Sequence, residues 1–123
     1  MTVLTCPDTP GHDLGGTRFT SLATPRRGTT ENAVWRVEID AGTQATPHSL
    51  TREEIFVVQE GRARVRIGDY EGEAGPGDAI VVPPGPEFEI SNNSDRILRL
   101  LCCLPVGGQA VMGGNAFTPP WAE

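Results

Sequence analysis

Glycine and proline occur throughout this chain at a density that few regular structures tolerate. The 15 glycines and 11 prolines make up about a fifth of the 123 residues. Both destabilise helix interiors, glycine through its backbone entropy and proline through its missing N–H group. Helical bundles and coiled coils are therefore excluded, and short strands joined by tight turns are favoured. A chain of this length forms one domain with a core of its own.

Alternation of apolar and polar residues marks the strands. In residues 34–39, Trp35, Val37 and Ile39 fall on one face and charged residues on the other. This period of two is typical of a half-buried strand. Further strands are predicted at residues 55–59, 62–67, 70–74, 79–82, 88–92 and 97–104. No segment predicts a helix, and so many short strands indicate a sandwich or a barrel.

The two ends of the chain differ from this central part, residues 31–106. Residues 1–30 are rich in Thr, Gly, Pro and Asp and are predicted to form an arm with one or two edge strands. Residues 107–123 form a tail rich in glycine and proline, which contains Trp121. Because a lone tryptophan is unfavourable in water, we expect Trp121 to dock on its own sheet or on a partner subunit.

Arginines occupy alternate positions of residues 62–67. A two-residue turn at Gly68-Asp69 would set Arg64 opposite Glu73 and Arg66 opposite Glu71. Such a stripe is either a cationic binding patch or a solvated outer face paired with acids. The second interpretation is favoured, because alternating charge on a strand face is usually solvated and paired.

The charge balance limits the partners and the chemistry. Sixteen acidic residues outnumber ten basic ones, which gives a net charge of −6. Such a surface repels phosphate groups, so nucleic acid is not expected as a partner. All ten basic residues are arginines, which excludes chemistry that needs a lysine Schiff base.

The cysteines and the apolar segments indicate the compartment. Cys102 and Cys103 are adjacent, so on a strand they point to opposite faces and do not bond to each other. Reduced thiols are typical of the cytoplasm. The amino terminus shows no secretory pattern, and the longest apolar run, residues 100–104, is too short to span a membrane. We therefore expect a cytoplasmic protein with no membrane partner.

Two stretches carry chemistry-bearing residues at fixed spacing. The first runs from Gly42 through His48 and Glu54 to Gly61. It resembles the first motif of the cupins, G-x5-H-x-H-x3,4-E-x6-G, at every spacing. Leu50 stands where that motif has its second histidine.

The second stretch runs from Gly77 through Pro83 and Gly85 to Asn92. It resembles the second cupin motif, G-x5-P-x-G-x2-H-x3-N, again at every spacing. Phe88 stands where that motif has a histidine. The resemblance implies an all-β, single-domain jelly-roll barrel of the cupin type.

The two departures concern the metal site that the resemblance implies. A typical cupin holds one divalent metal ion with three histidines and a glutamate, and here only His48 and Glu54 stand at those positions. Because catalytic metal sites normally use at least three protein ligands, no metal cofactor is expected. The alternative is one weakly held divalent ion with a replacement donor. Candidate donors are Gln44, Glu53, Glu89 and Cys102.

The remaining pair, His48 and Glu54, lies on one interior wall if the cupin spacing holds. A carboxylate beside an imidazole orients it and raises its pKa, which suits acid–base catalysis. The alternative is a mutually satisfied, inert pair. His12, the one other histidine, lies in the arm, which we expect to be flexible.

An apolar pocket is expected around this pair, because small-molecule sites are mostly apolar with few polar groups. Its predicted substrate-binding residues are Trp35, Val37, Leu50, Phe56, Phe88, Leu100 and Cys102. Trp35 is equally explained as core, and Cys102 is either a nucleophile or, more in keeping with its leucine neighbours, a small core residue.

Three functions are compatible with this pocket. The first is a metal-independent enzyme, an isomerase, cyclase or decarboxylase, in which Glu54 orients His48. The second is a non-catalytic module that binds or senses a small organic ligand. The third is a metal-dependent cupin, such as an oxygenase, with a rebuilt ligand set. We also expect a homodimer, in which residues 3–22 and an apolar face with Ile97, Leu101 and Cys103 form the interface.

Overall fold

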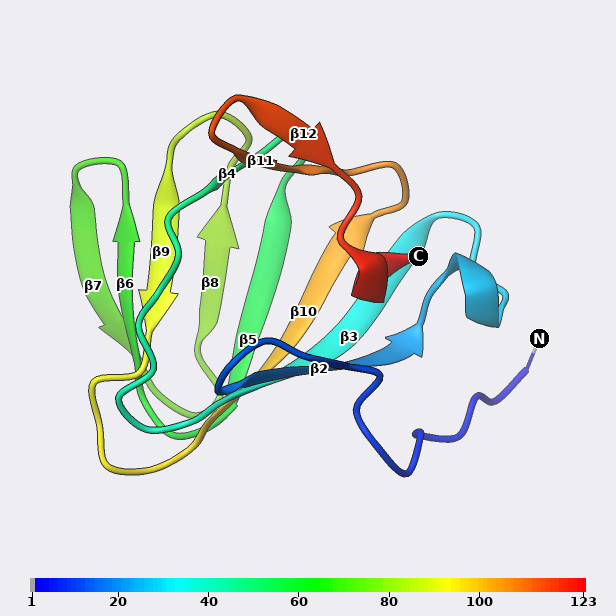
Figure 1. Ribbon diagram of the computed structural model, residues 1–123, viewed down its shortest axis with the longest axis horizontal. Coiled ribbons are helices and arrows are strands. Elements are labelled where there is room, and N and C mark those ends of the chain that lie inside the picture. The colour runs from blue at the N-terminus through cyan, green and yellow to red at the C-terminus, as the bar shows by residue number, and fades with distance from the viewer. Residues whose placement is uncertain (1) are drawn as a thin grey trace.

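The computed structural model describes residues 2–123 of the chain. This range contains twelve short strands and two single-turn 3₁₀ helices (Figure 1). No α-helix occurs in this range, which confirms the all-β prediction. The elements are β1 (His12–Asp13), β2 (Thr17–Ala23), η1 (Pro25–Arg27), β3 (Asn32–Ile39), β4 (Ser49–Leu50), β5 (Glu54–Glu60), β6 (Ala63–Ile67), β7 (Tyr70–Ala74), β8 (Ala79–Val82), β9 (Phe88–Ser91), β10 (Leu98–Pro105), β11 (Ala110–Met112), β12 (Asn115–Phe117) and η2 (Pro120–Ala122).

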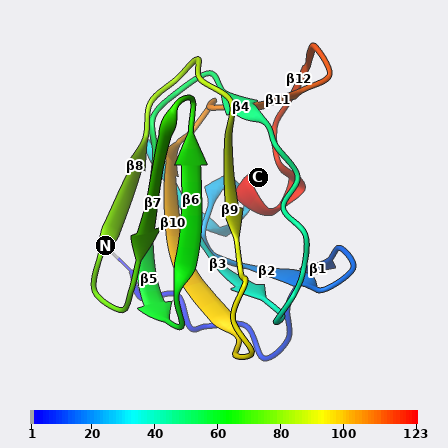
Figure 2. The same cartoon turned by 90° about the vertical axis from the view of Figure 1, so that its left-hand side faces the viewer.

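The strands form one long sheet and two short ones. The long sheet has the order β1-β2-β3-β10-β5-β8, and the short ones are β7-β6-β9 and β12-β11-β4. Backbone pairing of His48 with Phe88 connects the two short sheets. The long sheet curves behind β6 and β7, while β11 and β12 lie across one end (Figure 2).

The core lies between these layers. The inward residues of β10 are each at most 1% exposed: Leu98, Leu100, Cys102 and Leu104. Cys102 lies opposite Trp35 of β3 on one side and opposite Phe56 of β5 on the other. Each buried leucine in such a position stabilises the fold by about 1.5–3 kcal/mol. The alternation in the sequence thus correctly predicted the buried face of the central strands.

Strand positions in the central part agree closely with the sequence pattern. The predicted strands 70–74 and 79–82 coincide with β7 and β8. The other five differ from the observed strands by only one or two residues at their ends. The predicted register of β6 and β7 is confirmed, with Arg64 opposite Glu73 and Arg66 opposite Glu71.

The arginines of this stripe form ion pairs with acids on both sides of β6. Arg66 contacts Glu89 of β9 at 3.0 Å and Glu87 at 3.4 Å, because β9 lies on the other side of β6. Arg62 lies 3.7 Å from Glu73. These pairs support the interpretation of this stripe as a solvated, paired outer face.

The arm and the tail are more ordered than the sequence indicated. β2 is a seven-residue strand that pairs along β3 inside the long sheet. The tail folds back as β11, β12 and η2, and the Trp121 ring stacks on Phe19 of β2 with 3.6 Å between ring centroids. The Ser21 hydroxyl also donates to the Trp121 carbonyl at 2.6 Å. Trp121 therefore docks on its own sheet.

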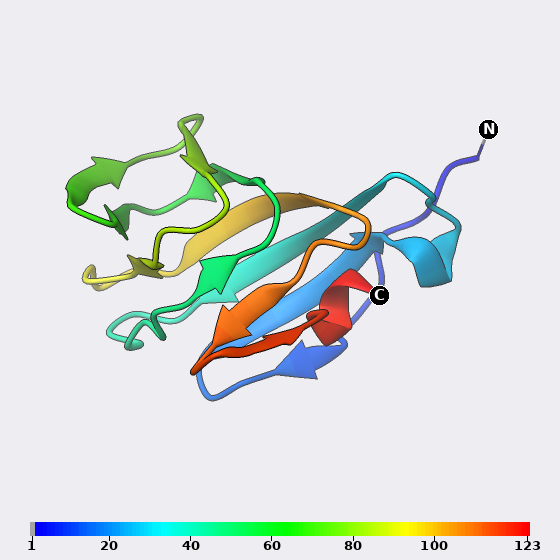
Figure 3. The same cartoon turned by 90° about the horizontal axis from the view of Figure 1, so that it is seen from above.

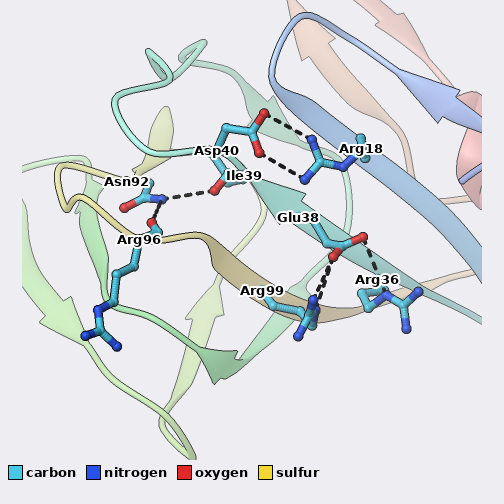
Figure 4. A network of polar contacts seen from close by, with 8 residues as sticks. All are labelled: Arg18, Arg36, Glu38, Ile39, Asp40, Asn92, Arg96 and Arg99. Carbon is cyan, nitrogen blue, oxygen red and sulfur yellow. Dashed lines mark hydrogen bonds and ion pairs between the residues drawn. The ribbon is translucent and has the colours of Figure 1, made fainter.

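Asn92 ties the end of β9 to its neighbours and is completely buried (Figure 4). Its side-chain amide donates to the carbonyls of Ile39 at 3.0 Å and Arg96 at 2.6 Å. Its carbonyl accepts from the backbone N–H and the hydroxyl of Ser94. The amide thus satisfies polar groups of two segments, the end of β3 and the turn at residues 94–96, which explains the asparagine that ends the second motif.

Asn92→Ala is expected to lower the free energy of unfolding by about 3 kcal/mol, because it removes the side-chain donor of the buried Ile39 carbonyl and all the other hydrogen bonds of the Asn92 amide. Urea unfolding of the variant measures this loss. The matched control is Asn93→Ala, because Asn93 is the exposed neighbour. Equal stability of the two variants would show that the buried amide is not needed.

Candidate functional site

A cavity of about 860 Å³ lies inside the barrel. Its wall is mostly apolar and aromatic, and it comes from strands of the long sheet, from β9 and from the tail. All but one of the residues predicted for the site line it: Trp35, Val37, His48, Leu50, Glu54, Phe56, Phe88 and Leu100.

Cys102 is the exception and does not line the cavity. Its side chain is fully buried between Trp35 and Phe56. Burial raises the pKa of its thiol well above the ordinary value, and the nearby Glu54 and Cys103 raise it further. The thiol therefore stays protonated, and Cys102 is a core residue rather than a nucleophile or ligand contact.

Glu54 is the most perturbed ionisable group of the site. It begins β5, where alternation turns Glu54 and Phe56 inward and Glu53 into solvent. The Glu54 residue is only 4% exposed, and its carboxyl group makes no hydrogen bond to residues 2–123. Burial raises its pKa from 4.5 to about 8. At neutral pH this group is thus mostly a neutral acid that offers a proton to the cavity.

His48 lies on a different segment, directly before β4, and is half-buried. Its backbone pairs with that of Phe88, and the two rings are 4.5 Å apart between centroids. The ring Nδ1 lies 3.0 Å from the carbonyl oxygen of Thr46, which can only accept. The neutral ring therefore carries its proton on Nδ1 and keeps a lone pair on Nε2.

The expected pairing of His48 with Glu54 is not seen as a direct contact. No hydrogen bond joins the two side chains in the described part of the chain, although both line the same cavity. The carbonyl of Thr46 takes the orienting role that the sequence assigned to Glu54. The two groups thus face the cavity independently of each other. Glu54 offers a buried acid, and His48 offers an imidazole with a free lone pair.

The residues present do not fit a divalent metal ion. Within residues 2–123, no three His, Cys, Asp or Glu side chains come together closely enough to hold one. Leu50 and Phe88 are 4% and 2% exposed and occupy the positions of the missing histidines. Of the four replacement donors, only Gln44 lines the cavity.

The cavity residues that sequence reasoning did not find include three aromatic rings, those of His12, Phe19 and Trp121. They come from the arm and the tail, which meet at one rim of the barrel, where β1 and η2 lie side by side (Figure 3). His12 lies in β1 and packs edge-on against Trp121 at 5.9 Å between ring centroids. The expectation of a flexible arm is thus wrong at His12, because β1 pairs with β2.

A family model described as the cupin domain matches residues 35–104 of this chain. This stretch is more than half of the protein. The chain belongs to the cupin family. An uncharacterized protein of Methanocaldococcus jannaschii, MJ1618, is 32% identical over 66 residues, which are 53% of each chain. This cupin thus spans about half the length of the curated relative that it matches.

Solved structures show the same fold. The polyketide cyclase RemF from Streptomyces resistomycificus superposes with a TM-score of 0.68 at 22% identity, covering 95% of this chain and 77% of that one. The plu4264 protein from Photorhabdus luminescens has a TM-score of 0.71 at 23% identity, covering 84% and 87%. At such identities the likeness concerns the fold alone, and it confirms the predicted jelly-roll barrel. Within residues 2–123, no helix is long and apolar enough to cross a bilayer.

Proposed function

We propose that this cupin binds an uncharged small organic molecule in its barrel cavity and catalyses acid–base chemistry on it. The observation that carries the proposal is the Glu54 carboxyl group. It lies in the cavity wall, is almost fully buried, has no hydrogen-bond partner among residues 2–123, and has a pKa of about 8. Carboxyl groups held protonated near neutral pH in a cavity are typical of acid–base sites.

The composition of the wall supports an uncharged ligand. Among the described residues that line the cavity, Glu54 is the only acid and no arginine occurs. A charged ligand would lose its hydration in this cavity without gaining a counter-ion. An apolar molecule with a carbonyl group instead finds both an apolar wall and a proton donor.

The arrangement suits the formation of an enol. The Nε2 lone pair of His48 takes a proton from the carbon next to the ligand carbonyl, while the Glu54 hydroxyl gives its proton to the carbonyl oxygen. The products are the enol, an imidazolium and a carboxylate, and the reverse transfers restore the starting groups. Enols are intermediates of isomerisation, cyclisation and decarboxylation, so the same two groups serve any of these three reactions.

Hydrogen–deuterium exchange of 1-tetralone in D₂O tests this chemistry by NMR. We expect the wild-type protein to accelerate exchange of the protons next to the carbonyl by about 100-fold or more over buffer. Glu54→Gln and His48→Gln should each remove most of this acceleration. Glu53→Gln is the matched control, because its side chain faces solvent, and it should retain the full rate.

The same experiment separates the alternative functions. Tetralone binding without exchange would support a non-catalytic binding or sensing module. Exchange that depends on added Mn²⁺ or Zn²⁺ and disappears with a chelator would support a rebuilt metal site. No binding of tetralone would contradict the proposed function altogether.

A further inference from the structure

We propose that His12 is a second polar anchor for the ligand, and that the ligand is therefore an uncharged ring compound with hydrogen-bond acceptors at two separated positions. This inference rests on the proposed function, because it concerns the same cavity. His12 would bind one acceptor and Glu54 the other, so His12 sets which molecules fit rather than taking part in proton transfer.

The backbone around His12 holds the residue in place. β1 pairs with β2 so that His12 lies opposite Phe19. The turn between these strands contains Gly16 at a φ of +99°, where a Cβ atom would come within 2.7 Å of the Thr43 hydroxyl oxygen. The Gly16 carbonyl also accepts from the backbone N–H of Asp40 at 2.8 Å. The hairpin is thus tied to the loop that lines the neighbouring part of the cavity.

Aromatic packing fixes the ring of His12. Its edge faces Trp121 at an interplanar angle of 71°, and Trp121 stacks on Phe19 at 10°. The tail carrying Trp121 is held to η1, where Arg26 contacts Glu123 at 3.0 Å. All three rings line the cavity. The stack therefore presents His12 to a ligand without a further conformational change.

The surroundings of the His12 ring indicate which nitrogen is available. Nδ1 is buried and has no hydrogen-bond partner in the described part of the chain. We assign the proton of the neutral ring to Nε2, because this tautomer places the N–H at the open nitrogen, where a ligand can accept it, and leaves only a lone pair at the buried Nδ1. Nε2 is not enclosed in this way and makes no hydrogen bond within residues 2–123. His12 thus offers one free N–H donor at the cavity.

The two anchors lie far enough apart to require an extended ligand. In the long sheet, four strand spacings separate β1, with His12, from β5, with Glu54. The two anchors are also offset along the strands. The row of residues that begins at His12 runs through Phe19, Val37 and Leu100 to Val58 of β5. Val58 is four residues from Glu54, which is about 13 Å along the strand at about 3.3 Å per residue. Both anchors donate hydrogen bonds, and apolar rings line the wall between them. A multi-ring compound with a carbonyl or ether oxygen near each end matches this pattern.

Three flavones test the inference by quenching of tryptophan fluorescence at pH 6.5, where Glu54 is protonated. Flavone carries one carbonyl group, 4′-methoxyflavone adds an acceptor on the distant ring, and 4′-methylflavone adds similar bulk without a strong acceptor. We expect the wild-type protein to bind the methoxy compound about 3- to 10-fold more tightly than the methyl compound, the gain of one hydrogen bond.

Variants assign this gain to His12. In His12→Phe, which keeps an aromatic ring against Trp121, the preference should disappear while flavone itself still binds. His12→Gln keeps an N–H donor and should retain part of the preference, and its thermal midpoint provides a second check on folding. An unchanged preference in His12→Phe would overturn the role of His12. Failure of all three flavones to bind the wild-type protein would instead count against the proposed function.

Discussion

Glu54→Gln is expected to stabilise the protein at pH 8 by up to about 5 kcal/mol, while leaving its stability near pH 4 almost unchanged. The folded protein holds the Glu54 pKa at about 8, against an ordinary value of 4.5, because the carboxyl group is buried. That difference of pKa corresponds to about 5 kcal/mol between the protonation states. Urea unfolding of both proteins between pH 4 and pH 8.5 measures it.

The sign follows from proton binding. Between pH 4.5 and pH 8 the unfolded chain has lost the Glu54 proton and the folded chain retains it, so stability falls as the pH rises. Glutamine does not ionise, so this part of the pH dependence disappears in the variant. Glu53→Gln, on the exposed neighbour, should retain the wild-type slope. Parallel pH profiles of wild type and Glu54→Gln would contradict a neutral, buried Glu54.

This stability loss also bears on function. A buried carboxyl group without a partner lowers stability, and replacing it by an apolar residue of similar size would remove the loss. Such groups are typical of sites where activity requires a strained or unsatisfied residue. If Glu54→Gln raises the free energy of unfolding and also abolishes tetralone exchange, the buried carboxyl group lowers stability and is required for activity.

The central strands could be predicted because one physical rule decides them. A strand buried on one side alternates, and Trp35, Val37 and Ile39 or Leu98 and Leu100 do so without interruption. The short strands of the tail lack this signal. β11 and β12 are three residues each, and the Asn115–Phe117 strand is exposed throughout. Their position depends on contacts with β4, which no local pattern records.

The motif spacing predicted one part of the candidate site. The spacing of the first motif placed His48 and Glu54 on one interior wall, and both line the same cavity. The partner of His48 was not predictable, because the Thr46 carbonyl is a backbone group of a turn. His12 and Trp121 are more than 100 residues apart, so only the folded chain brings them together.

The outer face of the long sheet is the part of the surface that we expect to bury in a homodimer. Ile55 of β5 and Val81 of β8 are 36% and 52% exposed, and they lie side by side with Cys103 of β10. Leu101 and Val57 form the next row. From β10 to β8 these neighbouring rows carry no charge, and Arg36 of β3 lies opposite Leu101 at their edge. A second copy related by a twofold axis therefore meets an apolar patch without like-charge repulsion at its centre.

Val81→Asp is therefore expected to raise the dissociation constant of the dimer by about 100-fold or more, because the twofold axis brings two buried carboxylates into one interface. Light scattering across a concentration series measures the shift toward the 13.1 kDa monomer. Tyr70→Asp, which alters an exposed residue of β7 in the β7-β6-β9 sheet, is the matched control and should leave the dimer intact.

Val3 is 89% exposed at the start of the arm, so Val3→Asp tests the arm's expected share of the interface. A wild-type protein that stays monomeric at micromolar concentration would contradict the dimer and leave the apolar rows of the long sheet facing water.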